Sequence, residues 1–399
     1  MITDPNFRGK DSAIKMKMTQ TNEANIMKKL GFGLMRLPLL NKEDQSSIDI
    51  EKVKRMVDTF MANGFTYFDT AYPYHRGYSE VAFREAVSTR YPRCAYTITD
   101  KLSLFMIRDE KEIPGFFDGQ LERLGVDYVD YYWIHAVNRQ TYQQAIKMHA
   151  FEFLARKKAE GKIRHIGFSF HDKADFLDEV LTAHPEMEYV QLQLNYLDWD
   201  DPAIESRRCY EVALKHRKPV IVMEPIKGGS LIQIPEEAKR IYEEARPDLS
   251  LASWAIRFAA SPSNVMMVLS GMSDEKQMSD NISYMKEFEP LSEEEQKKVS
   301  EAVKIIRASA GIPCTACRYC TETCPKRIPI PDYFALYNNQ KRFGEGASLG
   351  GIYYSSLAQT HGKASECLKC GKCEKLCPQH LPIREYLKEV ADVFEANRK

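Results

Sequence analysis

Short apolar runs alternate with longer amphipathic segments along the first three quarters of the chain. The apolar runs are typical of buried strands and begin near Leu30, Phe65, Ala95, Val129, Ile163, Tyr189, Val220 and Val265. The segments between them have helical periodicity, for example 48–62, 79–90, 141–160, 172–182, 202–217, 250–260 and 274–286. Eight strands alternating with helices over about 280 residues predict an α/β fold, a closed (β/α)8 TIM barrel rather than an open sheet.

Polar residues mark where several elements begin and end. Ser47, Ser79 and Asp172 are suited to cap the N-termini of helices. One further helix is expected at 292–309, and Gly311 and Pro313 follow it. The domain boundary is therefore predicted here, with a barrel domain over 27–310 and a second domain over 311–399. Residues 1–26 are polar and patternless, as in a disordered leader or an expression remnant.

The composition narrows the possible partners. The chain has 399 residues, of which 44% are hydrophobic, enough for one large domain and a smaller one. The 56 basic and 56 acidic residues balance, so no general attraction to nucleic acid or to a membrane surface is expected. No signal peptide and no apolar run of about 18 residues occurs, and we expect a cytoplasmic protein without a membrane span.

The ten cysteines are unevenly distributed. Cys94 and Cys209 stand alone and are expected to be small core residues, whereas the other eight follow residue 313. These eight form two runs of the pattern C-x-x-C-x-x-C-x-x-x-C-P, which are Cys314, Cys317, Cys320 and Cys324, then Cys367, Cys370, Cys373 and Cys377. The pattern resembles bacterial ferredoxins with two [4Fe–4S] clusters. Zinc is the alternative, but it gives no reason for the third cysteine of each run or for the Cys-Pro pair.

The resemblance also implies how the cysteines are shared. In two-cluster ferredoxins, the fourth cysteine of each run binds the other cluster. One cluster is therefore expected on Cys314, Cys317, Cys320 and Cys377, and the other on Cys367, Cys370, Cys373 and Cys324.

Four reactive side chains are expected at the carboxyl ends of three neighbouring strands. Asp69 and Tyr74 follow the strand near Phe65, Lys101 ends the next strand, and His135 ends the fourth. In such barrels the chemistry occurs at the carboxyl ends of the strands. A phenol has a reference pKa of about 10, and a neighbouring cation lowers it. Singly, these residues could be a cap, a surface charge and a core histidine, but the combination indicates a catalytic site.

The motif Asp-Thr-Ala-x-x-Tyr followed by a strand-end Lys and a strand-end His resembles the aldo-keto reductase family over roughly residues 28–290. The resemblance implies hydride transfer from a reduced nicotinamide to a carbonyl carbon. It implies that Tyr74 is the general acid, that Lys101 lowers the pKa of Tyr74, that Asp69 holds Lys101, and that His135 binds the carbonyl oxygen.

The expected cofactor contacts come from later strand ends. The resemblance places Ser169 and Gln191 at the nicotinamide carboxamide and Met223 against the ring, followed by Glu224, which can serve the substrate instead. Lys227 and Gly228 suit a pyrophosphate. After the eighth strand, Gly271, Gln277 and Asn281 are expected near the cofactor, but the basic residue common in NADP-dependent relatives is absent, with Lys276 as a substitute. NAD(H) and NADP(H) both stay open.

These observations favour an oxidoreductase that transfers hydride between NAD(P)H and a carbonyl, alcohol or sugar and carries two [4Fe–4S] clusters. One alternative is an electron-transfer protein that serves a ferredoxin, a flavodoxin-like partner or a one-electron substrate. Another is a non-catalytic redox sensor, which the complete set of four side chains disfavours. Because hydride carries two electrons and no flavin-binding segment is found, we expect no direct electron transfer from the nicotinamide to the clusters.

Overall fold

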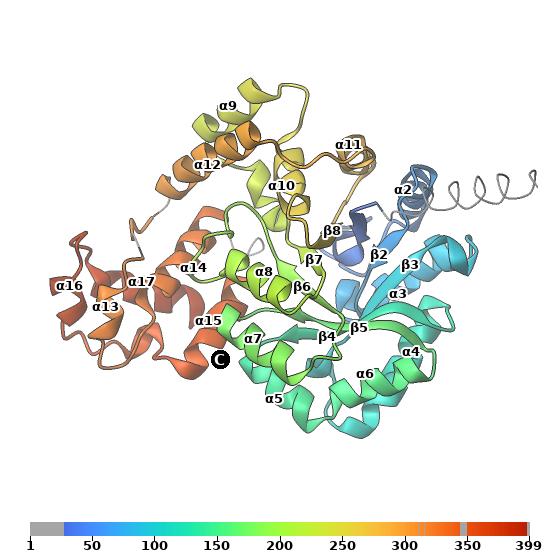
Figure 1. Cartoon of the computed structure of the whole chain (residues 1–399), viewed down its shortest axis with the longest axis horizontal. Coiled ribbons are helices and arrows are strands. Elements are labelled where there is room, and N and C mark those ends of the chain that lie inside the picture. Colours follow the sequence, from blue (N-terminus) through green and yellow to red (C-terminus); the bar gives the residue numbers. More distant parts are fainter. Residues whose placement is uncertain (1–27, 310, 315, 344–348, 397–399) are drawn as a thin grey trace, which may run out of the picture.

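Eight parallel strands, each paired with its neighbours in the sequence, close into a barrel (Figure 1). The computed structural model describes residues 28–309, 311–314, 316–343 and 349–396, so the predicted leader at 1–26 lies outside it. The strands are β1 Leu30–Gly33, β2 Tyr67–Asp69, β3 Thr97–Leu102, β4 Val129–Val137, β5 Ile163–Phe170, β6 Tyr189–Gln193, β7 Val220–Met223 and β8 Val265–Ser270. The pairing of β1 with β8 closes the sheet, as the alternation of apolar and amphipathic segments predicts.

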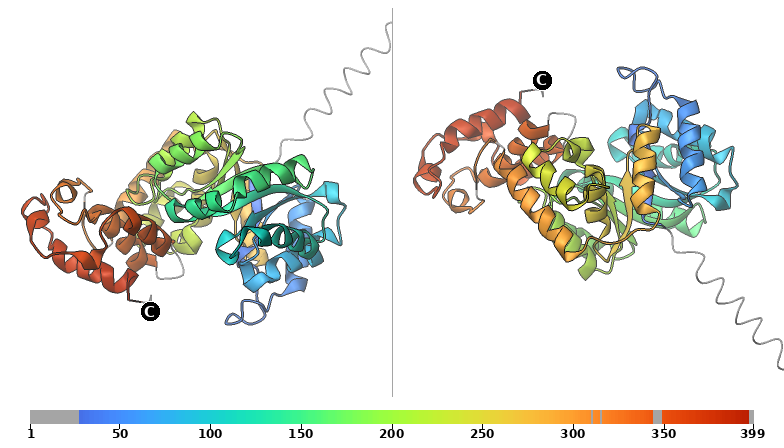
Figure 2. Two further views of the ribbon diagram at one scale, coloured as in Figure 1. Left: turned by 90° about the horizontal axis from the view of Figure 1, so that it is seen from below. Right: turned by 90° about the horizontal axis from the view of Figure 1, so that it is seen from above.

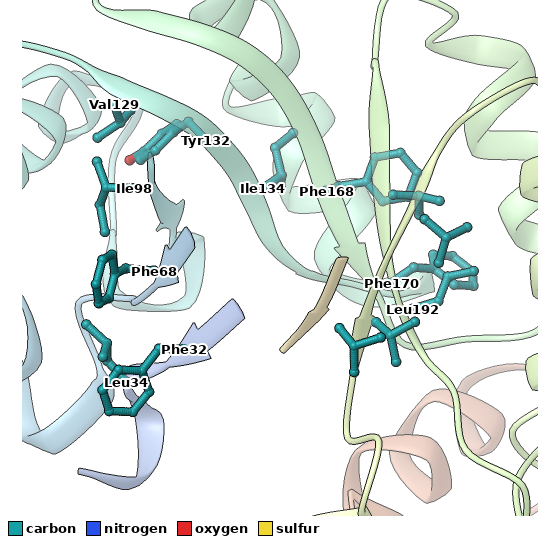
Figure 3. Packing of buried hydrophobic residues seen from close by; sticks show 14 of the residues in the cluster. Phe32, Leu34, Phe68, Ile98, Val129, Tyr132, Ile134, Phe168, Phe170 and Leu192 are labelled. Carbon is teal, nitrogen blue, oxygen red and sulfur yellow. The ribbon is translucent and has the colours of Figure 1, made fainter. Parts of the chain in front are cut away.

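Both faces of the barrel strands are apolar, which explains their continuous hydrophobic runs. Alternate residues point outward and pack beneath the helices, and Figure 3 shows this layer with Phe68, Ile98, Ile134 and Phe168. The residues between them point inward and fill the barrel interior, namely Tyr67, Tyr131, Trp133, Ile221, Met267 and Leu269. The interior is a packed core, so a reactive site can form only at its ends.

Gly167 in β5 is required by this packing. A Cβ atom there would lie 2.3 Å from the Tyr189 carbonyl oxygen and 2.5 Å from the ring of Trp133. No side chain fits such a space, so Gly167 allows the indole to fill the centre of the barrel.

Helices surround the barrel and follow the strands in order (Figures 1 and 2). They are α2 Ile50–Ala62, α3 Tyr78–Phe83, α4 Ile113–Leu124, α5 Arg139–Lys147, α6 Ala150–Ala159, α7 Ala174–Ala183, α8 Ser206–Lys215, α9 Glu236–Ala245, α10 Leu251–Ala260, α11 Glu275–Met285 and α12 Glu293–Ala308. The single helix predicted at 141–160 is wrong, because His149 has a φ of 49° and separates α5 from α6. A π-helical turn, Arg84–Ser88, continues α3.

The three predicted N-caps are also wrong. Asp49 caps α2 by accepting a hydrogen bond from the Lys52 amide, whereas Ser47 lies in the preceding turn. Ser79 lies inside α3, where its buried hydroxyl contacts the Thr70 hydroxyl at 2.7 Å. Asp172 lies one residue before the cap position of α7 and accepts a hydrogen bond from the Lys173 amide. Ser47 is thus held within its own turn, whereas Ser79 and Asp172 have distant partners that the local sequence does not reveal, since Asp172 also accepts hydrogen bonds from the Arg139 amide and the Ser356 hydroxyl.

The C-terminal residues form a separate group of short helices around a core of their own. These helices are α13 Tyr319–Glu322, α14 Ile330–Phe343, α15 Gly350–Thr360, α16 Lys372–Lys375 and α17 Ile383–Phe394. Their core contains aromatic and aliphatic side chains such as Tyr333, Phe334, Leu387 and Val390. In Figure 1, α14 and α15 lie next to the barrel, and α13 and α16 lie farthest from it. None of the described helices is long and apolar enough to cross a membrane.

A buried ion-pair network joins this group of helices to the barrel. Asp332 of α14, with 3% of its side chain exposed, binds Lys173 at 2.6 Å and Arg318 at 3.0 Å. Lys173 precedes α7 of the barrel, whereas Arg318 lies between two cysteines of the first run. The two cations overcome the effect of burial and lower the pKa of Asp332, so this carboxylate is charged and its charge is compensated.

Candidate active site

Tyr74 is positioned by a tight turn after β2. It begins the 3-10 turn Tyr74–Gly77, in which His75 and Arg76 have φ values of 51° and 55°. The buried ring of His75 fixes this turn, because its Nε2 accepts a hydrogen bond of 3.0 Å from the Leu37 amide. Non-glycine residues adopt such backbone angles only where the surroundings enforce them, which is common at functional sites. The turn holds the Tyr74 ring over the carboxyl end of the barrel.

Lys101 lies between Tyr74 and the base of the barrel. Its Nζ donates hydrogen bonds of 2.7 Å to Asp69 and to the Thr70 carbonyl oxygen, and it lies 4.8 Å from the centre of the Tyr74 ring. An ammonium has three N–H donors, so one is left for the side of the phenol. Burial alone would lower the pKa of Lys101, but Asp69 and Tyr74 raise it above the ordinary value, and Lys101 stays cationic.

Two opposing effects act on the acidity of Tyr74. Burial raises its pKa, and Lys101 counteracts this by favouring the phenolate. Lys101 therefore lowers the pKa of Tyr74, as expected from the sequence. Burial outweighs this effect, and the net pKa of Tyr74 lies above the ordinary value of a phenol. At neutral pH the phenol is protonated and can donate a proton.

His135 is presented by an irregularity in β4. The register with β5 shifts between Ile134 and Val137, and Ala136 has a φ of 58°. The Ala136 amide donates a hydrogen bond of 2.7 Å to the Ser169 hydroxyl, which stabilises this bulge. Bulges of this kind redirect a side chain beside an active site.

The imidazole of His135 is neutral. Burial, then Lys101 and His171, lower its pKa well below the ordinary value. Its Nδ1 lies 2.8 Å from the Ser103 hydroxyl, and its ring is 6.1 Å from that of Tyr74 and 5.4 Å from that of Phe105. A neutral imidazole beside a phenol can donate a hydrogen bond to a carbonyl oxygen.

Sequence reasoning missed Ser103, which contacts His135, and Arg36. Ser103 follows the strand-end Lys101 by two residues, so the same strand-end rule would have found it. Arg36 follows β1 and approaches Glu224 at 4.0 Å, and its side chain lies 3.2 Å from where a Cβ of Gly271 would be. It brings a cation to the side where the cofactor residues are expected.

The residues predicted at the nicotinamide lie in or directly after β5, β6 and β7. The Ser169 hydroxyl accepts the hydrogen bond of the Ala136 amide, and the side chain of Gln191 lies close to the carboxylate of Asp69. Met223 is half-buried at the end of β7. Glu224 has a φ of 56°, and burial raises its pKa. Of these side chains, Gln191 lies at Asp69, Ser169 lies at the bulge that presents His135, and Glu224 lies on the side of Arg36.

Lys227 has a partner that the sequence did not indicate. Its Nζ lies 2.6 Å from Asp198, and its side chain is only 2% exposed. Its charge is thus already compensated within the loops after β6 and β7. Gly228 and Gly229 have φ values of 66° and 94°, and a Cβ on Gly229 would meet nothing within 4 Å, so a ligand can approach this backbone closely.

The remaining predicted cofactor residues lie after β8. Gly271 is exposed, and Gln277 lies exposed in the first turn of α11, where its side chain accepts a hydrogen bond of 2.8 Å from the Ser273 amide. Asn281, one turn later, is buried and donates to the Gln277 carbonyl oxygen at 2.9 Å. Lys276 is exposed beside Gln277. Asn281 therefore supports the helix, and only the exposed members of this group face solvent.

The eight clustered cysteines line two cavities among the C-terminal helices. The lining of one cavity includes Cys314, Cys317, Cys320 and Cys377. The lining of the other includes Cys324, Cys367, Cys370 and Cys373. Each cavity thus has three cysteines from one run and the fourth cysteine from the other, which is the crossed arrangement expected from the sequence. Four thiols around each of two cavities of similar size fit the chemistry of an iron–sulfur cluster.

The barrel, the reactive groups at its carboxyl end and the cysteine cavities together define an oxidoreductase with an iron–sulfur domain. A model of the Aldo/keto reductase family matches residues 29–304, and the chain belongs to this family. A model of the 4Fe-4S dicluster domain matches residues 313–381, which implies two 4Fe-4S clusters and argues against the zinc alternative.

Curated relatives agree with this assignment. The chain is 28% identical over 220 residues to an aldo-keto reductase of Mycolicibacterium paratuberculosis, covering 54% of this chain and 68% of the relative. It is similar in fold to an aldo-keto reductase from Bacillus halodurans, with 23% identity, a TM-score of 0.56, and coverage of 69% of this chain and 91% of the other. An aldo-keto reductase from Klebsiella pneumoniae in complex with NADPH has 18% identity and a TM-score of 0.55, with 69% and 90% coverage.

Proposed function

We propose that this protein reduces the carbonyl of a small molecule, or oxidises the corresponding alcohol, with NADPH or NADH, and that Tyr74 is the general acid and base. The observation that carries the proposal is the Lys101 ammonium, which binds Asp69 and lies against the Tyr74 ring. The binding of NADPH by the Klebsiella pneumoniae protein, and the cation of Arg36 beside the expected cofactor face, favour NADP(H).

The chain's own residues would act on the carbonyl as follows. The reduced nicotinamide supplies a hydride to the carbonyl carbon when it is bound, with Ser169, Gln191, Met223 and Glu224 as its expected contacts. His135 donates a hydrogen bond to the carbonyl oxygen and orients it. Tyr74 gives its proton to that oxygen as negative charge develops, so one hydride and one proton convert the carbonyl into an alcohol. Lys101 stabilises the phenolate that is left.

Hydride transfer can be tested directly with the whole protein under anaerobic conditions. NADPH or NADH that carries deuterium at C4 of the nicotinamide is incubated with aldehydes, ketones and sugars. Transfer of the label to the carbinol carbon, with one nicotinamide oxidised per alcohol formed, supports the proposal. If the nicotinamide is oxidised without labelled alcohol, the proposed reaction is wrong.

Replacing Lys101 with Met should shift the pH dependence of the reaction. Alcohol oxidation needs the phenolate of Tyr74, so its rate rises as the pH rises through the pKa of Tyr74. Lys101 lowers that pKa, and its removal should move the rise to higher pH. The measurement is the pH profile of kcat for alcohol oxidation. Exposed Lys111 near the same strand provides a matched Lys→Met control, and a profile unchanged by Lys101→Met would show that this residue is not the partner of the phenol.

We also propose that each cysteine cavity holds one [4Fe–4S] cluster, with Cys314, Cys317, Cys320 and Cys377 around one and Cys367, Cys370, Cys373 and Cys324 around the other. The sulfur atoms supply four thiolates to each cluster, which is the usual ligand set. The lining of the two cavities supports this assignment.

Exchange of single electrons at the surface is a second candidate function. Cys317 and Cys370 are exposed, one at each cavity, and Leu368, which borders the cavity of Cys370, is 59% exposed. Anaerobic addition of NADPH should nevertheless give no reduced-cluster signal in electron paramagnetic resonance, because hydride carries two electrons and a cluster takes one, whereas dithionite should give the signal. Rapid appearance of the signal with NADPH alone would instead mean that the barrel and the clusters exchange electrons directly.

A further inference from the structure

The cavity of Cys370 has an excess of positive charge along its edge. Lys326, Lys372 and Arg384 line this cavity, and no carboxylate does so among the described residues. Arg384 is neutralised by an ion pair of 2.8 Å with Glu374. Lys326 and Lys372 are exposed, and within the described part of the chain neither of them forms an ion pair. Two uncompensated ammonium groups therefore flank this cavity.

The cavity of Cys317 has a different edge. In the described structure its one charged lining residue is Arg318, which is bound at 3.0 Å to the buried carboxylate of Asp332. The apolar side chains that line this cavity are buried. At the cavity of Cys370, by contrast, the apolar side chain of Leu368 is exposed. Among the described lining residues, uncompensated charge and an exposed apolar side chain therefore occur together at one of the two cavities.

This edge of the molecule is open to a large partner. Lys372 begins the short helix α16, which lies with α13 farthest from the barrel (Figure 1). Lys326 follows the last cysteine of the first run, so the two lysines come from distant parts of the sequence and meet at one cavity. Cys370 itself is exposed. A protein can therefore approach this cavity from the side that faces away from the barrel.

We propose that the lysine surface, made up of Lys326, Leu368 and Lys372, is the docking site of an acidic one-electron carrier protein of the flavodoxin type. The cluster in the cavity of Cys370 is then the one that exchanges electrons with this partner. One electron leaves the reduced carrier and reduces one cluster, and no bond or proton is exchanged. The inference rests on the proposed exchange of single electrons at the surface and names its site and its partner.

The chemistry of the lysine surface favours an acidic protein. An apolar contact with charged groups around it is the usual composition of a protein interface, and electron-transfer complexes use small interfaces of this kind. Opposite charges steer such partners together and fix their orientation. Salt weakens this attraction, because it screens exposed charges. A purely structural role, in which the lysines only balance the negative charge of the thiolates, predicts no dependence on the charge of the partner.

The double variant Lys326→Gln/Lys372→Gln tests the docking site in the holoprotein. Flavodoxin hydroquinone is mixed with the oxidised protein anaerobically at low salt, and stopped-flow absorbance and electron paramagnetic resonance follow the transfer of the electron. The second-order rate constant should fall about tenfold or more, and the affinity for oxidised flavodoxin should fall with it, at unchanged iron content. Lys304→Gln/Lys341→Gln is the matched control, because these exposed lysines line neither cavity. Lys326→Arg/Lys372→Arg keeps both charges and should keep the wild-type rate.

Reduced methyl viologen, a small cation, distinguishes docking from an effect on the cluster itself. It should reduce the Lys326→Gln/Lys372→Gln variant at least as fast as the wild type. Equal slowing with viologen and flavodoxin would overturn the inference, and so would equal rates of the variant and its control with flavodoxin. Reduction by viologen but not by flavodoxin would also overturn the docking site, yet leave electron exchange at the surface standing. Failure of both reductants would overturn both proposals.

Discussion

Tyr74→Phe should lower kcat for carbonyl reduction by roughly 10³-fold, within the range that a general acid contributes, while the affinity for NADPH survives. The substitution removes only the phenolic oxygen. Lys101 keeps its hydrogen bonds to Asp69 and to the Thr70 carbonyl oxygen, so the base of the site is unchanged. Steady-state kinetics gives kcat, and titration of the nicotinamide fluorescence gives the affinity.

Tyr78 provides a matched control for this substitution. It lies four residues later, at the start of α3, and is 53% exposed. Tyr78→Phe removes the same atom from the same segment and should leave kcat unchanged. An undiminished kcat in Tyr74→Phe would exclude the phenol as the proton donor.

Double replacements of different cysteine pairs should remove very different amounts of iron from the protein. Two clusters contribute about eight iron atoms per chain. Replacing Cys314 and Cys377 together removes two ligands of one proposed cluster, so about four iron atoms should remain. Replacing Cys324 and Cys377 together removes one ligand from each cluster, and little or no iron should remain. Iron analysis of the anaerobically purified variants, with electron paramagnetic resonance of the reduced proteins, separates the two outcomes.

The crossed arrangement is what this comparison tests. If each run bound its own cluster, Cys314 and Cys377 would belong to different clusters, and both double replacements would leave little or no iron. Cys94→Ala is the control, because Cys94 lines neither cavity. The core position expected for Cys94 is wrong, since it is exposed, whereas Cys209 is buried as expected. Since binding of the metal contributes folding free energy, loss of both clusters should also remove the thermal transition of the C-terminal helices.

The regular features of the fold could be predicted because they repeat. Strands β1 and β4 to β8 begin at the residues where their apolar runs begin, and only β2 and β3 start two residues late, at Tyr67 and Thr97. The strand-end rule placed Asp69, Tyr74, Lys101 and His135 on one face of the barrel, and the structure brings them together there. Their catalytic roles stay predictions. The spacing of the cysteines likewise predicted which four cysteines line each of the two cavities.

Features that depend on distant partners could not be predicted. The break between α5 and α6 at His149 has no glycine or proline that would predict it. Lys227 looks like a phosphate ligand in the sequence, yet its partner is Asp198. Asp332 and Lys173 are separated by 159 residues, and an ion pair at such a separation leaves no local pattern. The contacts that Asp172 and Lys173 make with the C-terminal helices, just after β5, also leave no local pattern.

The position of α15 in the sequence has a consequence for how the protein is made. The helix spans Gly350–Thr360, after the first cysteine run and before the second, so both of its flanks lead to cysteine cavities. During synthesis the barrel residues emerge first and can fold before any of these cysteines is available. The contact of Ser356 on α15 with Asp172 can therefore form only after the barrel residues have been made, so the docking of the C-terminal helices on the barrel is a late step of folding.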